Sequence, residues 1–435
     1  MSAAMQIDSL GQATVRRVSY RLLPFLMLAY LVCYIDRVNA GFAALQMNKA
    51  LGISPAVFGL GGGIFFVSYC LFEVPSNLAL ARFGARRWIA RIMISWGLVS
   101  GFMAASAGPN SFVLIRFLLG AAEAGFFPGV ILYLTYWFPA EQRAKIVGIF
   151  MVAIPVSGFI GAPISAALLG LNGFWGLAGW QWLFILEAAP AVILGFVCLA
   201  WLTDKPEHAA WLSPEQRDWL SRRLADEERQ RKPVEHVPVM HIIRNRYVLA
   251  MALVYAGGAT ASSGLGLWMP QFIKSFGVST MATGWLTALP NIIAAAVMVW
   301  WGFQSDRSGE RYWHTLGPLM ISGIALVLCL PFPGLAATIA LLCLSVTATA
   351  VTRGPFWALA SEWLSSRSAA AGLAMINAIG TGMGFFCNLF MGWTKQATGS
   401  YPLTMLPVVG FVVVASVVLV WIGRPHAVRL AAAAE

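Results

Sequence analysis

The chain has 435 residues and a formal net charge of +11; 59% of its residues are hydrophobic and only 11% are charged. A soluble domain carries about 25% charged residues, so this composition excludes an ordinary soluble globular protein. The apolar residues occur in runs that approach the roughly 20 residues needed to cross a bilayer as a helix. These runs lack the alternation of apolar and polar residues that spanning strands require, so they predict transmembrane helices.

Charged residues, glycines and prolines divide the chain into twelve predicted spans. The first six spans cover residues 21–45, 56–80, 88–107, 111–137, 144–169 and 180–202. The second six cover residues 247–275, 281–304, 313–331, 335–361, 368–393 and 402–423. We therefore predict an all-α polytopic membrane protein with twelve transmembrane helices in two pseudo-symmetric six-helix bundles.

The two sets of spans are separated by a charge-rich segment and flanked by short termini, so the chain has five regions. These are a cytoplasmic N-terminus (1–20), an N-terminal bundle (21–202), a cytoplasmic linker (203–246), a C-terminal bundle (247–423) and a cytoplasmic C-terminus (424–435). In the linker, Ser213 precedes Pro214 and Gln216, which is typical of a helix start with Ser as the cap and Pro at the first position. The linker is therefore predicted to contain an amphipathic helix.

Basic residues are divided unequally between the loops of the two sides. The loops of one side hold three: Lys49, Lys274 and Lys395. Three more lie within spans, so 23 of the 29 lysines and arginines fall on the side that holds both termini. Because Lys-rich and Arg-rich loops face the cytoplasm, both termini are predicted to be cytoplasmic. The positive charge thus reports orientation in the lipid bilayer, and we expect no binding of nucleic acid.

Seven charged residues lie well inside the predicted spans, away from the basic residues near the span ends, and a charge there costs at least about 2.5 kcal/mol. They are Asp36, Arg37, Glu73, Arg116, Glu123, Glu187 and Arg353. Arg37 has a planar set of donors that suits a substrate carboxylate; the alternative is an ion pair with an acid on another helix. Asp36 points about 100° away from Arg37 and is a candidate for proton coupling, for electrostatic control of Arg37, or for a structural pair.

The other five charges divide into three groups. Arg116 and Glu123 are seven residues apart and share a helix face, but an axial separation of about 10 Å is too long for an ideal direct pair. A face with both signs is hydrated or lines a cavity. Glu73 is predicted to cap or pair with a loop, and Glu187 to make a structural hydrogen bond. Arg353 either faces the cavity, where it and Arg37 could hold a dianion, or extends to the cytoplasmic interface.

The two halves contain a repeated loop segment. Residues 77–86 follow the second predicted span, and residues 302–311 follow the eighth. Matching residues recur at a constant offset of 225 positions: Arg82 and Arg307, Gly84 and Gly309, Arg86 and Arg311. Internal repeats of membrane halves are a mark of secondary transporters, whose binding site lies between the halves.

The segment from Gly302 through Asp306 to Arg311 resembles the GxxxDRxGxR loop motif of the major facilitator superfamily. Its first-half copy is degenerate, because Asn77 and Ala81 replace the Gly and the Asp. Further segments resemble the anion:cation symporter branch of that family, in its tartrate- and phthalate-type subgroup. They are residues 34–39, 72–77, 116–128 and 179–184.

The resemblance implies proton-coupled import of a small organic anion, such as tartrate or another dicarboxylate, a sugar acid or an aromatic carboxylate, across a bacterial inner membrane. It also implies that Arg37 contacts the anion, that Glu123 carries a proton and that Arg116 helps to control it. Four uncharged residues match family positions that line the site, although packing or an interfacial belt would also explain them: Tyr34, Tyr69, Trp357 and Asn377.

Other classes of function remain as alternatives. One alternative is an efflux transporter of the same fold. A cationic substrate is disfavoured for it, because Arg37 and Arg116 would repel a cation. A membrane sensor of organic anions would usually carry an additional signalling domain. We expect no enzyme, because the sequence has no nucleophile elbow, metal-ligand cluster or GxxxxGK[ST] nucleotide loop. We also expect no cofactor and no metal, and a monomer with a small organic anion and protons as its partners.

Overall fold

The computed structural model describes residues 2–230, 244–331, 334–363 and 369–423, and every regular element in these ranges is helical. Twelve helical stretches are long and apolar enough to cross a membrane, as the sequence predicts. The first half contains α1 (Ser2–Ala50), α2 (Pro55–Phe83), α3 (Ala85–Phe102), α4 (Pro109–Glu123), α5 (Phe126–Thr135), α6 (Ala140–Met151), α7 (Ala153–Leu168) and α8 (Gly179–Trp201). The second half contains α11 (Arg246–Lys274), α12 (Thr280–Ser308), α13 (Tyr312–Cys329), α14 (Leu335–Val351), α15 (Arg353–Trp363), α16 (Ala369–Thr398) and α17 (Leu406–Ile422).

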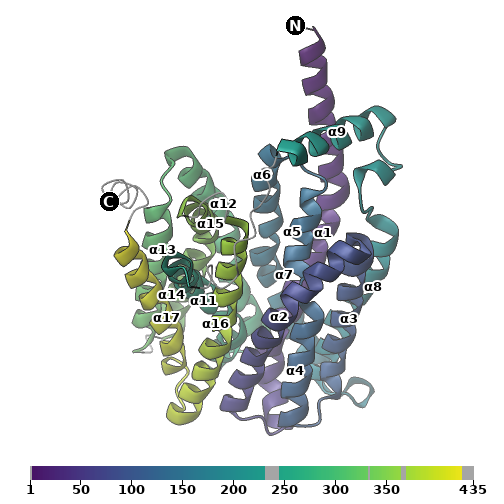
Figure 1. Ribbon diagram of the computed structural model, residues 1–435. Coiled ribbons are helices and arrows are strands. Elements are labelled where there is room, and N and C mark those ends of the chain that lie inside the picture. Colours follow the sequence, from purple (N-terminus) through teal and green to yellow (C-terminus); the bar gives the residue numbers. More distant parts are fainter. Residues whose placement is uncertain (1, 231–243, 332–333, 364–368, 424–435) are drawn as a thin grey trace.

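The helices form two bundles that stand side by side, α1–α8 in purple to teal and α11–α17 in green to yellow (Figure 1). Within the first bundle, α3 packs on α8 and α2 packs on α4; within the second, α11 packs on α16 and α17. Three helix pairs join the bundles: α2 with α16, α7 with α12, and α1 with α11. The predicted architecture is therefore confirmed.

The two halves start their second spans in the same way. α2 begins at Pro55 and α12 begins at Thr280, and this is the same offset that separates Arg82 from Arg307. Ser54 caps the first helix, its Oγ accepting a hydrogen bond from the Val57 amide at 3.3 Å. Ser279 caps the second, accepting from the Ala282 amide at 3.1 Å. The offset of the loop repeat thus relates equivalent positions of the two halves.

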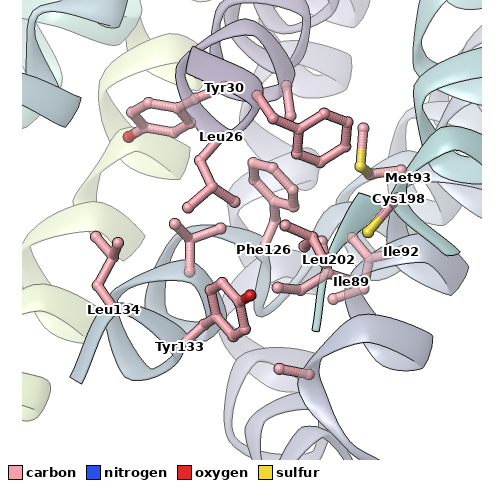
Figure 2. Close-up of a cluster of buried hydrophobic side chains, with 14 of the residues drawn as sticks. Leu26, Tyr30, Ile89, Ile92, Met93, Phe126, Tyr133, Leu134, Cys198 and Leu202 are labelled. Carbon is pink, nitrogen blue, oxygen red and sulfur yellow. The ribbon is translucent and has the colours of Figure 1, made fainter. Parts of the chain in front are cut away.

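A cluster of buried hydrophobic side chains holds the first bundle together. Figure 2 shows Leu26 and Tyr30 of α1 near Phe126 of α5, with Ile89 and Met93 of α3 beside them. These side chains are at most 3% exposed, so the interior of this half is closely packed.

Small residues form the seam between the halves. Gly59 of α2 lies against Gly392 of α16, where an added Cβ would come within 2.8 Å of the Gly392 Cα. Gly284 of α12 lies against Ala166 of α7, where the corresponding Cβ–Cβ distance would be 2.6 Å. Gly59 and Gly284 follow closely on the N-terminal ends of α2 and α12. The halves are therefore in tight contact at the end of the molecule opposite α9.

Several spans depart from the predicted continuous helices. α1 is helical from Ser2, well before the predicted start at residue 21. The fourth span is broken between Glu123 and Phe126, where Ala124 and Gly125 leave the helical conformation. The fifth and tenth spans are irregular only at Val152 and Thr352, whose φ and ψ remain helical. The break in the fourth span was not expected because the apolar pattern continues through it.

The linker contains α9 (Pro214–Gln230), which begins where the capping residues predict. The Gln216 amide donates to Ser213 Oγ at 3.3 Å, and the Ser213 amide donates to Gln216 Oε1 at 3.2 Å. Glu227 attaches α9 to the first half, because its carboxylate accepts from Arg143 Nη1 at 2.6 Å and from the Ala140 amide at 3.1 Å. The linker helix is thus bound to the N-terminus of α6.

Candidate functional site

A cavity of about 220 Å³ lies between the two bundles. Its volume is below the roughly 300–1,000 Å³ of pockets for drug-sized ligands, so it suits a small molecule. Its charged and polar lining comes from both halves and includes Tyr34, Arg37, Tyr69, Arg116, Tyr255, Ser262, Arg353, Trp357 and Asn377. Six predicted substrate residues therefore meet in one space: Tyr34, Arg37, Tyr69, Arg353, Trp357 and Asn377.

Arg37 of α1 forms an ion pair with Glu123 at the end of α4. The Arg37 side chain is 18% exposed, whereas the Glu123 side chain is only 1% exposed. The guanidinium also lies over three rings, with centroid distances of 5.0 Å to Tyr34 and 5.4 Å to Phe65 and Tyr69. Arg37 Nε is buried and has no partner among the described residues. One side of the cation is thus bound by Glu123, while the group remains accessible from the cavity.

Glu123 occupies the last position of α4, just before the break in the fourth span. Gly125 has φ +85°, a conformation that favours glycine, and a Cβ there would lie 2.4 Å from Ser76 Oγ. The break places the Glu123 carboxylate at the negative end of the α4 helix dipole, which disfavours an anion. Cys33 Sγ donates weakly to Glu123 Oε1 at 3.2 Å. The Arg37 guanidinium is therefore the principal group that stabilises the charge of Glu123.

Asp36 faces the interior of the first bundle and makes no ion pair with Arg37 among the described residues. Its Oδ2 accepts from Trp96 Nε1 at 2.8 Å, and its Oδ1 accepts from Ser100 Oγ at 3.2 Å. The residue is 1% exposed and does not line the cavity. Asp36 and Arg37 therefore have different partners, as the sequence predicts, because the two side chains leave α1 in different directions.

Arg116 lines the cavity without contacting Glu123, as their separation along the helix predicts. Its Nε donates to the Gly61 carbonyl at 3.2 Å, and its guanidinium lies 5.0 Å from the centroid of the Phe65 ring. Arg116 thus adds positive charge near the Arg37–Glu123 pair while it also ties α4 to α2.

Arg353 faces the cavity, one of the two positions that the sequence allows. It is the first residue of α15 and follows Thr352, the irregular position of the tenth span. Its Nη2 donates to Ser262 Oγ of α11 at 2.8 Å. Tyr255 of α11 stacks on Phe356 and Trp357 nearby, with centroid distances of 5.3 and 4.9 Å. Sequence reasoning missed Tyr255, although the offset of the repeat makes it the counterpart of Tyr30, which also lines the cavity.

Two other buried acids have the following partners. Glu73 was expected to cap a helix or pair with a loop, and this expectation is wrong, because α2 continues well beyond it to Phe83. Its Oε1 instead accepts from Asn377 Nδ2 of α16 at 3.3 Å, across the boundary between the halves. Glu187 makes the hydrogen bond that was expected, accepting from Ser165 Oγ at 2.6 Å.

The loop segment after α12 is held by Arg311, whose Nη1 contacts Asp306 Oδ1 at 2.7 Å and Ser305 Oγ at 2.8 Å. Gly309 has φ +65° and ends α12. Gly302 and Arg307 lie in the last turns of α12. The motif therefore forms a compact turn between α12 and α13.

The degenerate copy after α2 is arranged differently. Gly84 has φ +88° and separates α2 from α3, while Arg82 is exposed at the end of α2. Asp204, from the segment after α8, accepts a hydrogen bond from the Arg86 amide at 2.8 Å. A carboxylate from outside the repeat thus contacts the residue equivalent to Arg311, although Ala81 occupies the position equivalent to Asp306.

Comparison with known proteins gives consistent results. Residues 26–387 match the family model described as Major Facilitator Superfamily. The chain is 47% identical over 417 residues to a protein of Agrobacterium vitis named "Putative tartrate transporter", with 96% of each chain covered. It is 40% identical over 391 residues to a "Quinolone resistance transporter" of Acinetobacter baumannii, with 89% of each covered.

Among solved structures, the fold is similar to that of a D-xylose-proton symporter, with a TM-score of 0.72 and 15% sequence identity. The match covers 93% of this chain and 97% of that one. At this level of identity the similarity concerns the fold alone.

Proposed function

Because the chain belongs to the Major Facilitator Superfamily, and is a membrane transporter and not an enzyme, we propose that it is a proton-coupled symporter that imports a small organic anion. The observation that carries this proposal is the ion pair between Arg37 and Glu123 at the cavity wall. This pair lets one event, the binding of an anion, change the proton affinity of a buried acid.

The coupling follows from competition for Arg37. A substrate carboxylate that binds the guanidinium bidentately takes the place of Glu123, because both acceptors need the same N–H donors. Glu123 is then a buried carboxylate at the negative end of a helix dipole without its cation. Breaking a buried ion pair in this way costs about 3–5 kcal/mol, so Glu123 takes up a proton. Anion and proton therefore bind together, which is the requirement for symport.

Arg116 and Asp36 have supporting parts in this proposal. The Arg116 cation, near the pair, favours the charged form of Glu123 and so promotes release of the proton after the anion has left. Asp36 is a second acid on α1, held by Trp96 and Ser100. A change in its charge would alter the field at the neighbouring Arg37, and we assign it to proton coupling on this basis.

The uncharged lining contributes to substrate recognition. Tyr34 and Tyr69 lie beside Arg37 and present hydroxyl groups and ring faces to a bound anion. Trp357 and Asn377 line the same cavity from the second half. Since Asn377 also donates to Glu73 of α2, the substrate and an inter-half contact share this residue. Candidate substrates are a dicarboxylate such as tartrate, a sugar acid or an aromatic carboxylate, the first in keeping with the name of the relative at 47% identity.

The proton gradient supplies the energy. One elementary charge that crosses 100 mV yields about 2.3 kcal/mol. The excess of basic residues on the side of the termini supports a bacterial inner-membrane protein with both termini in the cytoplasm. In this orientation the seam formed by Gly59 and Gly284 closes the periplasmic end. The loop segments around Asp306 and Asp204 lie at the cytoplasmic end. Their contacts hold neighbouring helix ends together in one of the states of alternating access. We assign the functional unit to a monomer.

An efflux antiporter is the second candidate, because the relative at 40% identity is named for quinolone resistance. Quinolones carry a carboxylate, so Arg37 could bind them as well. The two functions differ in the direction of proton movement: import with a proton makes uptake faster when the outside is acidified, whereas antiport makes it slower. A non-transporting sensor would show neither response.

Counterflow in proteoliposomes tests the proposal directly. Vesicles that contain the purified full chain are loaded with one unlabelled anion and exposed to the same labelled anion, for tartrate, a sugar acid, phthalate, nicotinate and hydroxyphenylacetate in turn. We expect exchange for at least one of these anions, and net uptake that increases with an inward proton gradient. Absence of exchange for every anion, in vesicles whose protein remains folded, would refute organic-anion transport.

A further inference from the structure

The second half brings a cation into the cavity, Arg353, with which none of the described acids forms an ion pair. Arg353 lines the cavity, and Ser262 Oγ accepts from its Nη2 at 2.8 Å. Among the residues that the structure describes, no carboxylate lies within ion-pair distance of Arg353. A hydroxyl group satisfies one N–H donor but leaves the charge uncompensated. This contrasts with Arg37, whose charge is paired with Glu123.

The internal repeat relates the partner of Arg353 to Arg37. Ser262 follows Arg37 at the same offset that separates the starts of α2 and α12. Arg353 is not the repeat equivalent of Glu123, because this offset leads from Glu123 to Ala348 in α14, but both residues belong to the fourth span of their half. Each half therefore makes a contact between its first span and its fourth. The first half uses an arginine and an acid there, and the second uses a serine and an arginine.

We propose that Arg353 binds the second carboxylate of a short dicarboxylate whose first carboxylate is bound by Arg37. The cavity then selects dianions. This inference rests on the proposed function. The residues between the two cations support a single ligand that spans them. Tyr34 lies 5.0 Å from the Arg37 guanidinium. Tyr255 of α11 lines the same cavity as Tyr34 and Arg353, and its ring packs against Phe356 and Trp357 of α15. The proposed ligand contacts these two hydroxyl groups between its two carboxylates.

Charge balance gives the reason for selectivity. When the substrate has displaced Glu123 and that acid is protonated, the positive charges of Arg37 and Arg353 both face the ligand. A dianion pairs with both of these cations, whereas a monoanion leaves the Arg353 cation desolvated without a counter-charge, which is unfavourable. The monoanion also lacks the charge-assisted hydrogen bonds of the second carboxylate. Dianions should therefore bind at least about tenfold better than monoanions of the same shape, which corresponds to about 1.4 kcal/mol.

The test compares tartrate with its monoamide, which has almost the same shape but one carboxylate fewer; malate and its monoamide form a second pair. Each compound is used to inhibit counterflow of a labelled anion that the wild-type protein exchanges. For wild type we expect half-inhibition by at least one diacid at a concentration about tenfold or more below that of its monoamide. For Arg353→Gln we expect this ratio to approach one, chiefly because the diacid binds more weakly. Arg353→Lys should retain part of the preference.

Ser262→Ala is the matched control, since it keeps the Arg353 cation and removes only its hydroxyl partner; it should preserve a preference for the diacid. Thermal stability and size-exclusion profiles establish that each variant is folded. Equal inhibition by diacid and monoamide in wild type would overturn the inference, as would an Arg353→Gln variant with an unchanged ratio or with equal weakening for both compounds. Exchange of monocarboxylates alone would overturn the inference but leave organic-anion transport intact. Exchange of no organic anion would overturn both.

Discussion

At the scale of single residues, the buried acids of the first bundle differ in their contact partners, and these partners indicate different roles. Glu123 is paired with a cation that the cavity also reaches, whereas Asp36 and Glu187 accept hydrogen bonds from neutral donors inside the first bundle. Substrate can compete for the first kind of contact but not for the second. The Arg37–Glu123 pair is therefore the place where binding and protonation can influence each other.

Replacement of Glu123 by Gln should separate exchange from proton-driven uptake. Gln is similar in shape to protonated Glu, so Glu123→Gln mimics the proton-loaded form and leaves Arg37 free for the anion. We expect counterflow to persist, while an inward proton gradient no longer raises net uptake. Measurement of both activities on the same proteoliposomes checks this. Loss of both activities in a folded variant would remove Glu123 from the role of proton carrier.

Replacement of Arg37 by Lys tests whether a planar, bidentate contact is needed. Lys keeps the charge but presents a single ammonium group in place of the guanidinium fork. We expect the substrate concentration for half-maximal counterflow to rise at least about tenfold, which corresponds to about 1.4 kcal/mol of lost binding. Lys274→Arg, at the C-terminal end of α11 and outside the cavity, is the control and should leave this concentration unchanged. An unaltered affinity in Arg37→Lys would contradict the bidentate contact.

The sequence identified most charged residues of the cavity but not all of their partners. The cost of burying charge made Arg37, Arg116 and Glu123 conspicuous in apolar helices. The spacing within one helix also showed that Arg116 does not pair directly with Glu123. The Arg37–Glu123 contact joins helices that are far apart in the chain, so no periodicity in the sequence could reveal it.

At the scale of helices, the break in span four was the main feature that the sequence did not predict. Apolar residues continue through this break, so composition alone favours a continuous helix. Gly125 marks the break: its positive φ favours glycine, and the absence of a Cβ leaves room for Ser76 of α2. By contrast, the cap of α9 was predictable, because Ser213 and Gln216 contact each other within four residues.

Gly125→Ala should therefore impair both folding and transport. An alanine with positive φ costs roughly 1–2 kcal/mol, and its Cβ would also overlap Ser76 Oγ. We expect a lower melting temperature in detergent and a loss of proton-driven uptake, because Glu123 would no longer end α4 in the same place. Gly410→Ala in α17, where a Cβ has open space, is the control and should leave both quantities unchanged. Wild-type behaviour of Gly125→Ala would show that the break is not required.

The linker helix should depend on Glu227 for its attachment. Glu227→Gln removes the charge that Arg143 and the N-terminus of α6 share. The carboxylate is partly exposed, so we expect a modest loss of about 1 kcal/mol. Hydrogen exchange should be faster in α9 and in the first turn of α6, and Glu228→Gln, at an exposed position, should behave like wild type. Equal exchange rates in Glu227→Gln and wild type would contradict this attachment.

At the scale of the whole molecule, the number of spans, the internal repeat and the division into two halves were predicted from the sequence, and the structure confirms them. These features follow from apolar length and from the constant offset between matching residues of the two halves. The way the halves meet was not predictable, since Gly59, Gly284 and Gly392 are only three of the 42 glycines in the chain. Their function as a seam depends on which helices face each other.

The predicted orientation can be measured with alkaline phosphatase, which is active only outside the cytoplasm. Alkaline phosphatase fused to the chain after Gly173, between α7 and α8, should be active, because this loop lies on the side with few basic residues. Alkaline phosphatase fused after Asp204 should be inactive. The reverse pattern would place the termini outside and would invert the direction assigned to the proton gradient.

The position of Asp204 bears on the history of the two halves. Alanine stands at position 81 where the second half has Asp306, yet a carboxylate from another part of the chain reaches the Arg86 amide. After a gene duplication, selection can preserve a charge at a point in space while the residue that supplies it changes. The two halves thus both have a carboxylate at this turn, but it comes from different parts of the chain and makes different contacts: with a side chain in the second half and with a backbone amide in the first.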